Sequence, residues 1–190
     1  MPRARVNKIV DPFRERAGAT SAFGLLANSV KTAAKVAWRD LRRNWLTRPS
    51  FVPRVARFAL YRLAGLHIET PNIFAHCYIE DVELHIGTGT FVNRGVYFQG
   101  AGTVSIGRDC LIGPECAFLT ARHEHSTTGL TRFATNESIV VGERVLLGAR
   151  VLLLPGAIIE DDVVVGAGAV VNGNCLAGGF YAGVPARRME

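Results

Sequence analysis

The sequence predicts a mainly β protein, in which a parallel β-helix follows a helical segment and carries one protruding loop. Three observations lead to this class. The N-terminal third has apolar residues at helical spacing, the remainder has them at a six-residue spacing, and one polar stretch interrupts the six-residue period. A chain of 190 residues buries one sizeable core, so we expect one β-helical domain with an appended segment.

The N-terminal segment, residues 1–66, is predicted to be basic and helical. Apolar side chains recur every three or four residues over residues 21–43, and a second helix is expected over residues 51–66 after a break at Pro49. Residues 1–65 contain fourteen Lys or Arg and three Asp or Glu, a net charge of +11, whereas the rest of the chain carries −5. The basic character of the protein therefore belongs to its N-terminal third.

The second predicted helix carries Phe51, Val55, Phe58 and Leu63 along one side, with arginines among the other positions. The commoner role of such a helix is to pack on its own domain. A sequence that is amphipathic, basic and aromatic is also typical of helices that bind an anionic membrane surface. Peripheral membrane contact through this segment is therefore the second interpretation, and no nucleic-acid partner is expected.

No part of the sequence predicts a membrane span or a signal peptide. The longest apolar runs fall well short of the ~20 residues that cross a bilayer. The basic residues near the start, Arg3, Arg5 and Lys8, are not followed by an apolar stretch. We expect a cytoplasmic protein, or one that is peripheral at the inner face of the membrane.

The six-residue period covers residues 67–180, the predicted β-helical domain, and a tail is expected over residues 181–190. Near the end, aliphatic residues follow one another at intervals of six without exception: Val141, Leu147, Leu153, Ile159, Val165 and Val171. A short fixed period is typical of a β-solenoid, in which each unit buries its apolar side only by stacking on the next. The first and fifth residues of each hexad are predicted to point inward, and the Gly-rich second and third positions to form corners.

Three of the four cysteines, Cys110, Cys116 and Cys175, occupy the fifth position of a hexad. They are interpreted as small core residues rather than as catalytic or metal-binding groups. The four cysteines lack the close CxxC spacing of a zinc site, so we expect reduced thiols and no metal cofactor.

The in-phase hexads stop after His123 and resume at Ile139. The intervening residues 124–138 include Gly, Ser, Thr and Asn, which favour a protruding loop. Long loops on a rigid scaffold are where catalytic side chains tend to lie. The interruption is therefore the first place to look for an active site.

The hexads and the order of four motifs resemble those of the hexapeptide-repeat acyltransferases. The similarity is greatest to the maltose, galactoside and nodulation-type sugar O-acetyltransferases and to acyltransferases of polysaccharide synthesis. The motifs cover about residues 66–188 and read IGTGTFVNRG, VSIGRDCLIGPECAFLTARHEH, IVVGERVLLGARVLLLPGAIIEDDVVVGAGAVV and YAGVPARR. The resemblance implies a left-handed β-helix, a homotrimer with active sites between neighbouring subunits, acetyl-CoA as acyl donor, and a small-molecule or glycan acceptor.

The resemblance also implies which residues act. A sugar hydroxyl needs a general base to attack a thioester, and histidine suits that role near neutral pH. His123 follows Thr120 in the Thr-x-x-His setting of the family's catalytic histidine, with His125 as the alternative. Glu124 is the neighbouring carboxylate that could orient the base. Asn93 matches the family's acceptor-contacting asparagine, although an Asn at a corner also suits a turn.

Donor binding is expected along the C-terminal coils. The resemblance implies that the pantetheine arm lies beside Gly148, Ala149, Ala167 and Gly168, and that Arg187 meets the nucleotide phosphates, with Arg188 as a second cation.

Several positions depart from the family pattern. Near the donor, Leu146 replaces a tryptophan, Asn172-Gly173 replaces a Thr-Lys pair, and Glu190 replaces an arginine. Toward the acceptor, Gln99 and Gly100 stand where related sequences carry an acidic residue. The identity of the acceptor and the length of the acyl group therefore stay open.

Three alternatives stay open as well. Serine O-acetyltransferases share the fold and the histidine chemistry, and residues 1–66 partly match their helical domain. γ-Class carbonic anhydrases share the solenoid and hold zinc with three histidines from neighbouring subunits. His67 and His85, one coil apart, are predicted to stack, with His76 halfway between. The third alternative is a non-catalytic scaffold, against which His123 and Arg187 argue.

Overall fold

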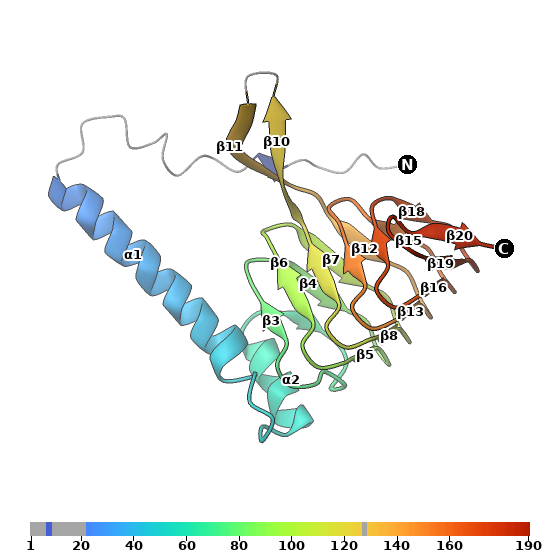
Figure 1. Cartoon of the computed structure of the whole chain (residues 1–190). Helices are drawn as coiled ribbons and strands as arrows, with labels where there is room; N and C mark the ends of the chain where they lie inside the picture. Colours follow the sequence, from blue (N-terminus) through green and yellow to red (C-terminus); the bar gives the residue numbers. More distant parts are fainter. Residues whose placement is uncertain (1–6, 9–21, 127–128) are drawn as a thin grey trace.

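The computed structural model describes residues 7–8, 22–126 and 129–190. The helix α1 (Ala22–Asp40) runs into a short π-helical stretch (Leu41–Trp45), and α2 (Arg54–Leu63) follows before the chain enters the coils. In Figure 1, α1 stands away from the coils and α2 lies beside the first of them. The predicted helical segment in front of a mainly β domain is confirmed. Residues 1–6 and 9–21 of that predicted segment lie outside the described residues.

Three sheets form the walls of the β-helix. The first sheet contains β2 (His67–Ile68), β4 (Glu83–Ile86), β7 (Thr103–Ile106), β12 (Ile139–Val141), β15 (Ile158–Ile159) and β18 (Asn174–Cys175). The second sheet contains β5 (Phe91–Val92), β8 (Leu111–Ile112), β13 (Leu146–Leu147), β16 (Val164–Val165), β19 (Phe180–Ala182) and β20 (Arg187–Met189). The third sheet contains β3 (Tyr78–Ile79), β6 (Tyr97–Gln99), β9 (Ala117–Leu119), β14 (Leu152–Leu153) and β17 (Val170–Val171).

Each coil passes once through each sheet, so one coil contains three hexads. Val141 therefore pairs in parallel with Ile159, and Leu147 with Val165. The three corners are named by the sheets that they join. The first corner lies between the first and second sheets, the second corner between the second and third, and the third corner between the third sheet and the next strand of the first.

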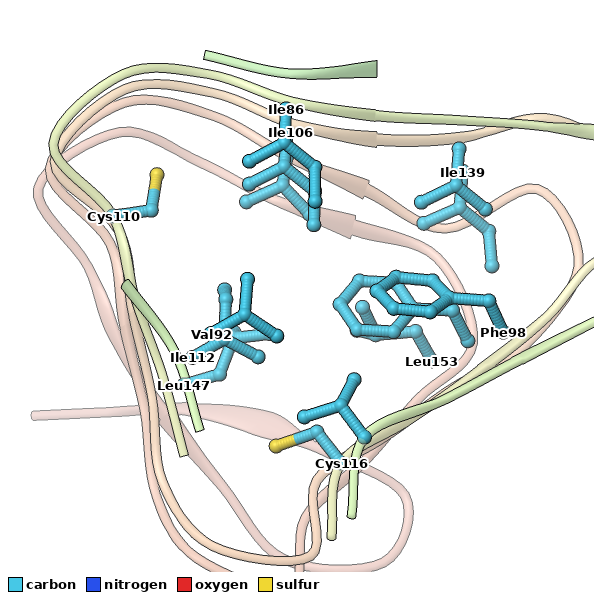
Figure 2. Packing of buried hydrophobic residues seen from close by; sticks show 14 of the residues in the cluster. Ile86, Val92, Phe98, Ile106, Cys110, Ile112, Cys116, Ile139, Leu147 and Leu153 are labelled. Carbon is cyan, nitrogen blue, oxygen red and sulfur yellow. The ribbon is translucent and has the colours of Figure 1, made fainter. Parts of the chain in front are cut away.

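The inward side chains form one buried stack along the axis (Figure 2). Ile86 stands on the first sheet, Val92 on the second and Phe98 on the third, and each is repeated by an apolar residue in the coils that follow. Cys110 fills the first corner and Cys116 the second. All four cysteines are buried and unpaired. The predicted inward positions of the hexad and the core role of the cysteines are confirmed.

The corners follow a different rule from the predicted one. The left-handed backbone conformation occurs at the fourth position of the hexad, for example at Arg144 (φ 55°), Arg150 (φ 59°) and Gly168 (φ 71°). Glycine is favoured at the second position for a different reason: neighbouring coils approach each other too closely there to leave room for a side chain. A Cβ on Gly148 would lie 2.5 Å from the main-chain nitrogen of Ala167 in the next coil.

The helical segment covers the open edge of the third sheet. The side-chain amide of Asn44 pairs with the main chain of Ile79, donating to its carbonyl at 3.0 Å and accepting from its N–H at 2.8 Å. Arg43 donates to the carbonyl of Glu80 at 2.7 Å. Since β3 is the edge strand of its sheet, these bonds satisfy main-chain groups that no earlier coil reaches.

The helix α2 packs on the first coil through a polar and aromatic face. Tyr61 is fully buried, and so is nearly all of Arg57. Arg57 donates to four main-chain carbonyls, those of Thr47 (2.6 Å), Pro49 (3.0 Å), Val52 (2.9 Å) and Ile73 (3.0 Å). This side chain therefore fixes both the break before α2 and the docking of the helix.

The apolar side of α2 faces solvent, which differs from the expected packing through that side. Phe51, Val55 and Leu63 are exposed by 86%, 72% and 78%, and only Phe58 of the four residues packs against the core. The reason is the set of carbonyls that lies beneath the helix. Only a side chain rich in N–H donors can satisfy them, so Arg57 turns the helix polar side inward.

A protrusion at the predicted interruption is confirmed, but it is a β-hairpin that begins three residues before the predicted bounds of 124–138. The strands β10 (Ala121–Ser126) and β11 (Gly129–Asn136) pair antiparallel, and β1 (Asn7–Lys8) pairs with β11. Figure 1 shows the hairpin projecting beyond the coils from the third corner.

Candidate active site

Buried polar side chains fix the base of the hairpin to the third corner. The hydroxyl of Thr120 donates to the carbonyl of Gln99 at 2.8 Å and accepts from the N–H of Gly102 at 3.1 Å. At the other end of the hairpin, buried Asn136 accepts from the N–H of Ala101 at 3.0 Å. Both strands of the hairpin are thus anchored to the corner of the preceding coil.

The predicted base His123 lies on β10, three residues beyond Thr120 and opposite Ala134 of β11. Its side chain is exposed. The pairing register shifts between His123 and His125, so these two residues are not equivalent positions on the strand. The side chains of Glu124 and His125 lie outside the described residues.

The structure places Asn93 at the second corner, after β5. It is half-buried, its N–H donates to the carbonyl of Ile112 at 3.0 Å, and its Oδ1 accepts from the N–H of Arg94 at 2.8 Å. The bond at Oδ1 is turn chemistry that Asn commonly supplies. An acceptor would therefore have to be contacted through the side-chain NH₂ group.

The four residues predicted to line the donor's arm stack on this same corner. Gly148 and Ala149 follow β13, and Ala167 and Gly168 follow β16 one coil later. The N–H of Gly168 donates to the carbonyl of Ala149 at 2.8 Å. Ala167 and Gly168 are exposed, and a Cβ on Gly168 would meet nothing within 4 Å. We call these four residues the donor ridge, a stretch of main chain that only small side chains cover.

Arg187 lies next to the second corner. The chain turns after β19, where Gly183 accepts from and Ala186 donates to the main chain of Val170, and Arg187 then begins β20. The strand β20 runs antiparallel to β19, with Arg187 opposite Ala182, so the predicted tail closes the second sheet. Arg187 is exposed and donates to the carbonyl of Ala186 at 2.9 Å.

The predicted site residues fall into two groups. Asn93, the donor ridge and Arg187 share the second corner, whereas His123 stands at the third corner. Within one chain the third sheet separates the two groups. The structure therefore does not bring the predicted base and the predicted donor residues together on a single subunit.

One candidate residue was missed by the sequence analysis. Glu80, at the third corner, accepts from the N–H of Gly100 at 3.0 Å and from the hydroxyl of Tyr97 at 2.6 Å, and the bond raises the pKa of Tyr97 to about 12. A carboxylate thus lies beside Gln99 and Gly100, where related sequences supply an acidic residue. The spacing of eighteen residues that linked His67 to His85 does not find it, because β3 and β6 pair at a spacing of nineteen, Tyr78 with Tyr97.

The histidines named in the zinc alternative do not all gather. His67 stacks on His85 with ring centroids 4.7 Å apart, as predicted, but His76 lies at the second corner of the first coil, its Nε2 hydrogen-bonded to Ser50 at 2.8 Å. Across residues 7–8, 22–126 and 129–190, no three His, Cys, Asp or Glu side chains are grouped to hold a metal ion. Burial also raises the pKa of Cys77 and of Cys116 to about 11, so these thiols stay protonated at neutral pH.

Comparison with known proteins supports the assignment of the coils. Residues 138–173 match the family model described as bacterial transferase hexapeptide, six repeats. The chain is 37% identical over 106 residues to WbbJ of Escherichia coli strain K12, provisionally named a lipopolysaccharide biosynthesis O-acetyl transferase. That match covers 50% of this chain and 54% of WbbJ, so the chain spans about half the length of this relative.

Solved structures share the fold. A maltose O-acetyltransferase from Clostridium difficile 630 superimposes with a TM-score of 0.70 at 19% identity, covering 83% of this chain and 86% of that one. The hexapeptide-repeat acetyltransferase VCA0836 from Vibrio cholerae, complexed with acetyl coenzyme A, gives 0.68 at 25% identity, covering 83% and 87%. Because coils of opposite hand do not superimpose, the match agrees with the left-handed β-helix that the resemblance implies. The chain therefore carries the hexapeptide repeat of bacterial transferases over residues 138–173 and shares the fold of hexapeptide-repeat acetyltransferases.

Proposed function

We propose that the protein transfers an acetyl group from acetyl-CoA to a hydroxyl of a sugar or glycan acceptor, with His123 as general base. The observation that carries the proposal is the place of His123. It is an exposed histidine on a hairpin that is hydrogen-bonded to the preceding coil at its base, at the longest interruption of the repeat. The complex of the similar VCA0836 with acetyl-CoA and the provisional name of WbbJ support the donor and the acceptor class.

The active site is proposed to form between two copies in a homotrimer. Large exposed hydrophobic residues lie on the first sheet (Val140, Ile158) and on the second sheet (Leu111, Leu146, Val164, Phe180), and none lies on the third sheet, whose strands are all described. Apolar columns of this kind favour contacts between copies. If three copies pack with their first corners at the axis, the second corner of one copy meets the third corner of the next.

This arrangement would unite the two groups of residues. His123 of one copy would face Asn93, the donor ridge and Arg187 of its neighbour. The donor ridge suits the narrow pantetheine arm, because no side chain on Gly168 stands between a ligand and the main chain. Exposed Arg187 and Arg188 suit the phosphates of the nucleotide.

The proposed reaction needs one base and no covalent enzyme intermediate. His123 takes the proton of the acceptor hydroxyl while the oxygen attacks the thioester carbonyl carbon. The C–S bond then breaks, the acetyl ester of the acceptor forms, and the thiolate of CoA takes the proton back from the imidazolium. Asn93 would position the acceptor through its NH₂ group.

We test the function by the release of CoA thiol from acetyl-CoA in the presence of a panel of sugars. We expect turnover with at least one sugar, and a loss of at least about 100-fold in His123→Ala, because a positioned base contributes roughly that much. His67→Ala is the matched control: it removes another exposed histidine, which stacks on His85 in the first coil and is not part of the hairpin, and it should keep normal turnover.

Other outcomes would assign another role. Near-normal turnover in His123→Ala together with a loss of turnover in His125→Ala would assign the role of base to His125. Turnover with free L-serine and none with the sugars would favour a serine O-acetyltransferase. Failure to bind CoA at all would support a non-catalytic scaffold.

A further inference from the structure

The outward face of α2 is an exposed apolar surface. Val55, Ala59 and Leu63 are spaced by four residues, so they lie along one side of the helix, and Phe51 precedes them at the same spacing. Val55 is 72% exposed, Leu63 78% and Phe51 86%. We call these four residues the α2 patch.

The α2 patch is not explained by the packing of the chain. The inward face of α2 is made by Arg57 and Tyr61, so the helix has its polar anchor inside and its apolar side in solvent. Single exposed hydrophobic residues are ordinary on a protein surface, but a run of them along one helix face marks an interaction site.

Along the sequence, the charges of the segment that contains the α2 patch are of one sign. Between Asp40 and Glu69 there are six arginines, of which Arg57 is buried, and no acidic residue. Arg54 stacks over the ring of Phe74 at 5.3 Å, and Arg62 donates to the carbonyl of Ile68 at 3.1 Å. These contacts hold two exposed guanidinium groups along the line where α2 meets the first coil, beside the apolar residues.

We propose that the α2 patch binds an anionic lipid surface. Apolar side chains on the outward face would enter the boundary of the acyl chains, while the arginines beside them would meet lipid phosphates. A second copy of the chain is a disfavoured partner for this patch. A contact between two α2 faces would place arginine against arginine, with no acidic residue of α2 to compensate. The apolar columns suited to contacts between copies lie elsewhere, on the first and second sheets.

The position of α2 suits this role. It lies beside the first coil, and the C-terminal strands lie at the far end of the stack (Figure 1). Copies related by an axis parallel to the stack would present their patches in the same direction. If the proposed trimer forms, three patches would then reach one surface together and strengthen a weak single contact.

The test is sedimentation of the full chain with vesicles of phosphatidylcholine alone and with vesicles that contain phosphatidylglycerol as well. We expect binding to the anionic vesicles, weakened by added salt, and little binding to the neutral ones. In the triple variant Phe51→Ser, Val55→Ser and Leu63→Ser, binding should fall at least about ten-fold. All three residues are over 70% exposed, so their replacement should leave the fold intact.

Val184→Ser is the matched control, since Val184 is 73% exposed at the other end of the β-helix, and its binding should equal that of the wild type. Absence of binding by the wild type, equal binding to both kinds of vesicle, or full binding by the triple variant would each overturn the proposal. Dissociation of the oligomer by the triple variant would assign the patch to subunit contacts instead. Acetyl transfer in solution does not depend on vesicles, so a failure here leaves the proposed function standing.

Discussion

At the scale of residues, glycine serves two separate purposes in these coils. Gly168 takes the left-handed conformation at the fourth position of its hexad, where charged residues such as Arg144 and Asp162 do the same elsewhere. Gly148, at the second position, is needed because the next coil lies against it. The period was readable from the sequence, but these two causes were not, since the close approach joins residues eighteen or more positions apart.

This distinction predicts opposite effects of two glycine substitutions. Gly148→Ala should lower the free energy of unfolding by ~1–3 kcal/mol, because its Cβ would overlap the main chain of Ala167. Gly173→Ala should be neutral or stabilising by at most about 1 kcal/mol, because its Cβ meets nothing within 4 Å and its φ is not positive. Urea unfolding at one fixed protein concentration measures both. Equal stability of the two variants would mean that the coils do not pack closely enough at Gly148 to exclude a Cβ.

The catalytic candidates show the same limit. The place of His123 beside the protrusion was predictable, because this residue ends the last hexad before the interruption; its role as base stays a prediction. The carboxylate of Glu80 beside Gly100 was not predicted, because the two residues are one coil apart and the bond depends on the register of the stack.

At the scale of elements, spacing predicted where the helices and the protrusion lie but not which face is covered. The predicted helix at residues 51–66 begins at Arg54 and ends at Leu63. Its apolar side faces outward because the carbonyls under it select Arg57. Those carbonyls belong to the loop before the helix and to the first coil, so the pattern of residues within the helix could not predict them.

Arg57 is therefore predicted to be the main anchor of α2. Replacing it with Met should lower the free energy of unfolding by at least about 3 kcal/mol, because four carbonyls lose a charged donor and the bonds to two of them, those of Thr47 and Ile73, are buried. Arg62→Met is the control: Arg62 is exposed and makes one bond of this kind, so it should cost about 1 kcal/mol or less. If both variants lose the same stability, the anchoring role of Arg57 is wrong.

At the scale of the whole molecule, the β-helix brings residues that are distant in sequence to the same corner. Every turn of the stack returns to the same three corners, so residues from distant hexads gather on one edge. The donor ridge, Asn93 and Arg187 share the second corner in this way, and the hairpin with His123 occupies the third. The repeat predicted that the coils stack. The separation of the two groups follows only when each hexad is assigned to one of the three sheets.

The central claim is that His123 of one copy acts on a donor held by the ridge of the next copy. The direct test mixes two inactive variants, His123→Ala and Ala167→Trp, the latter placing an indole on the exposed donor ridge. Each variant alone should release little CoA thiol. In co-refolded mixtures of equal amounts, about one quarter of the sites would combine an intact histidine with an intact ridge. We therefore predict about a quarter of wild-type turnover, with mixed oligomers verified by mass spectrometry. Mixed oligomers no more active than the separate variants would contradict a site built between copies.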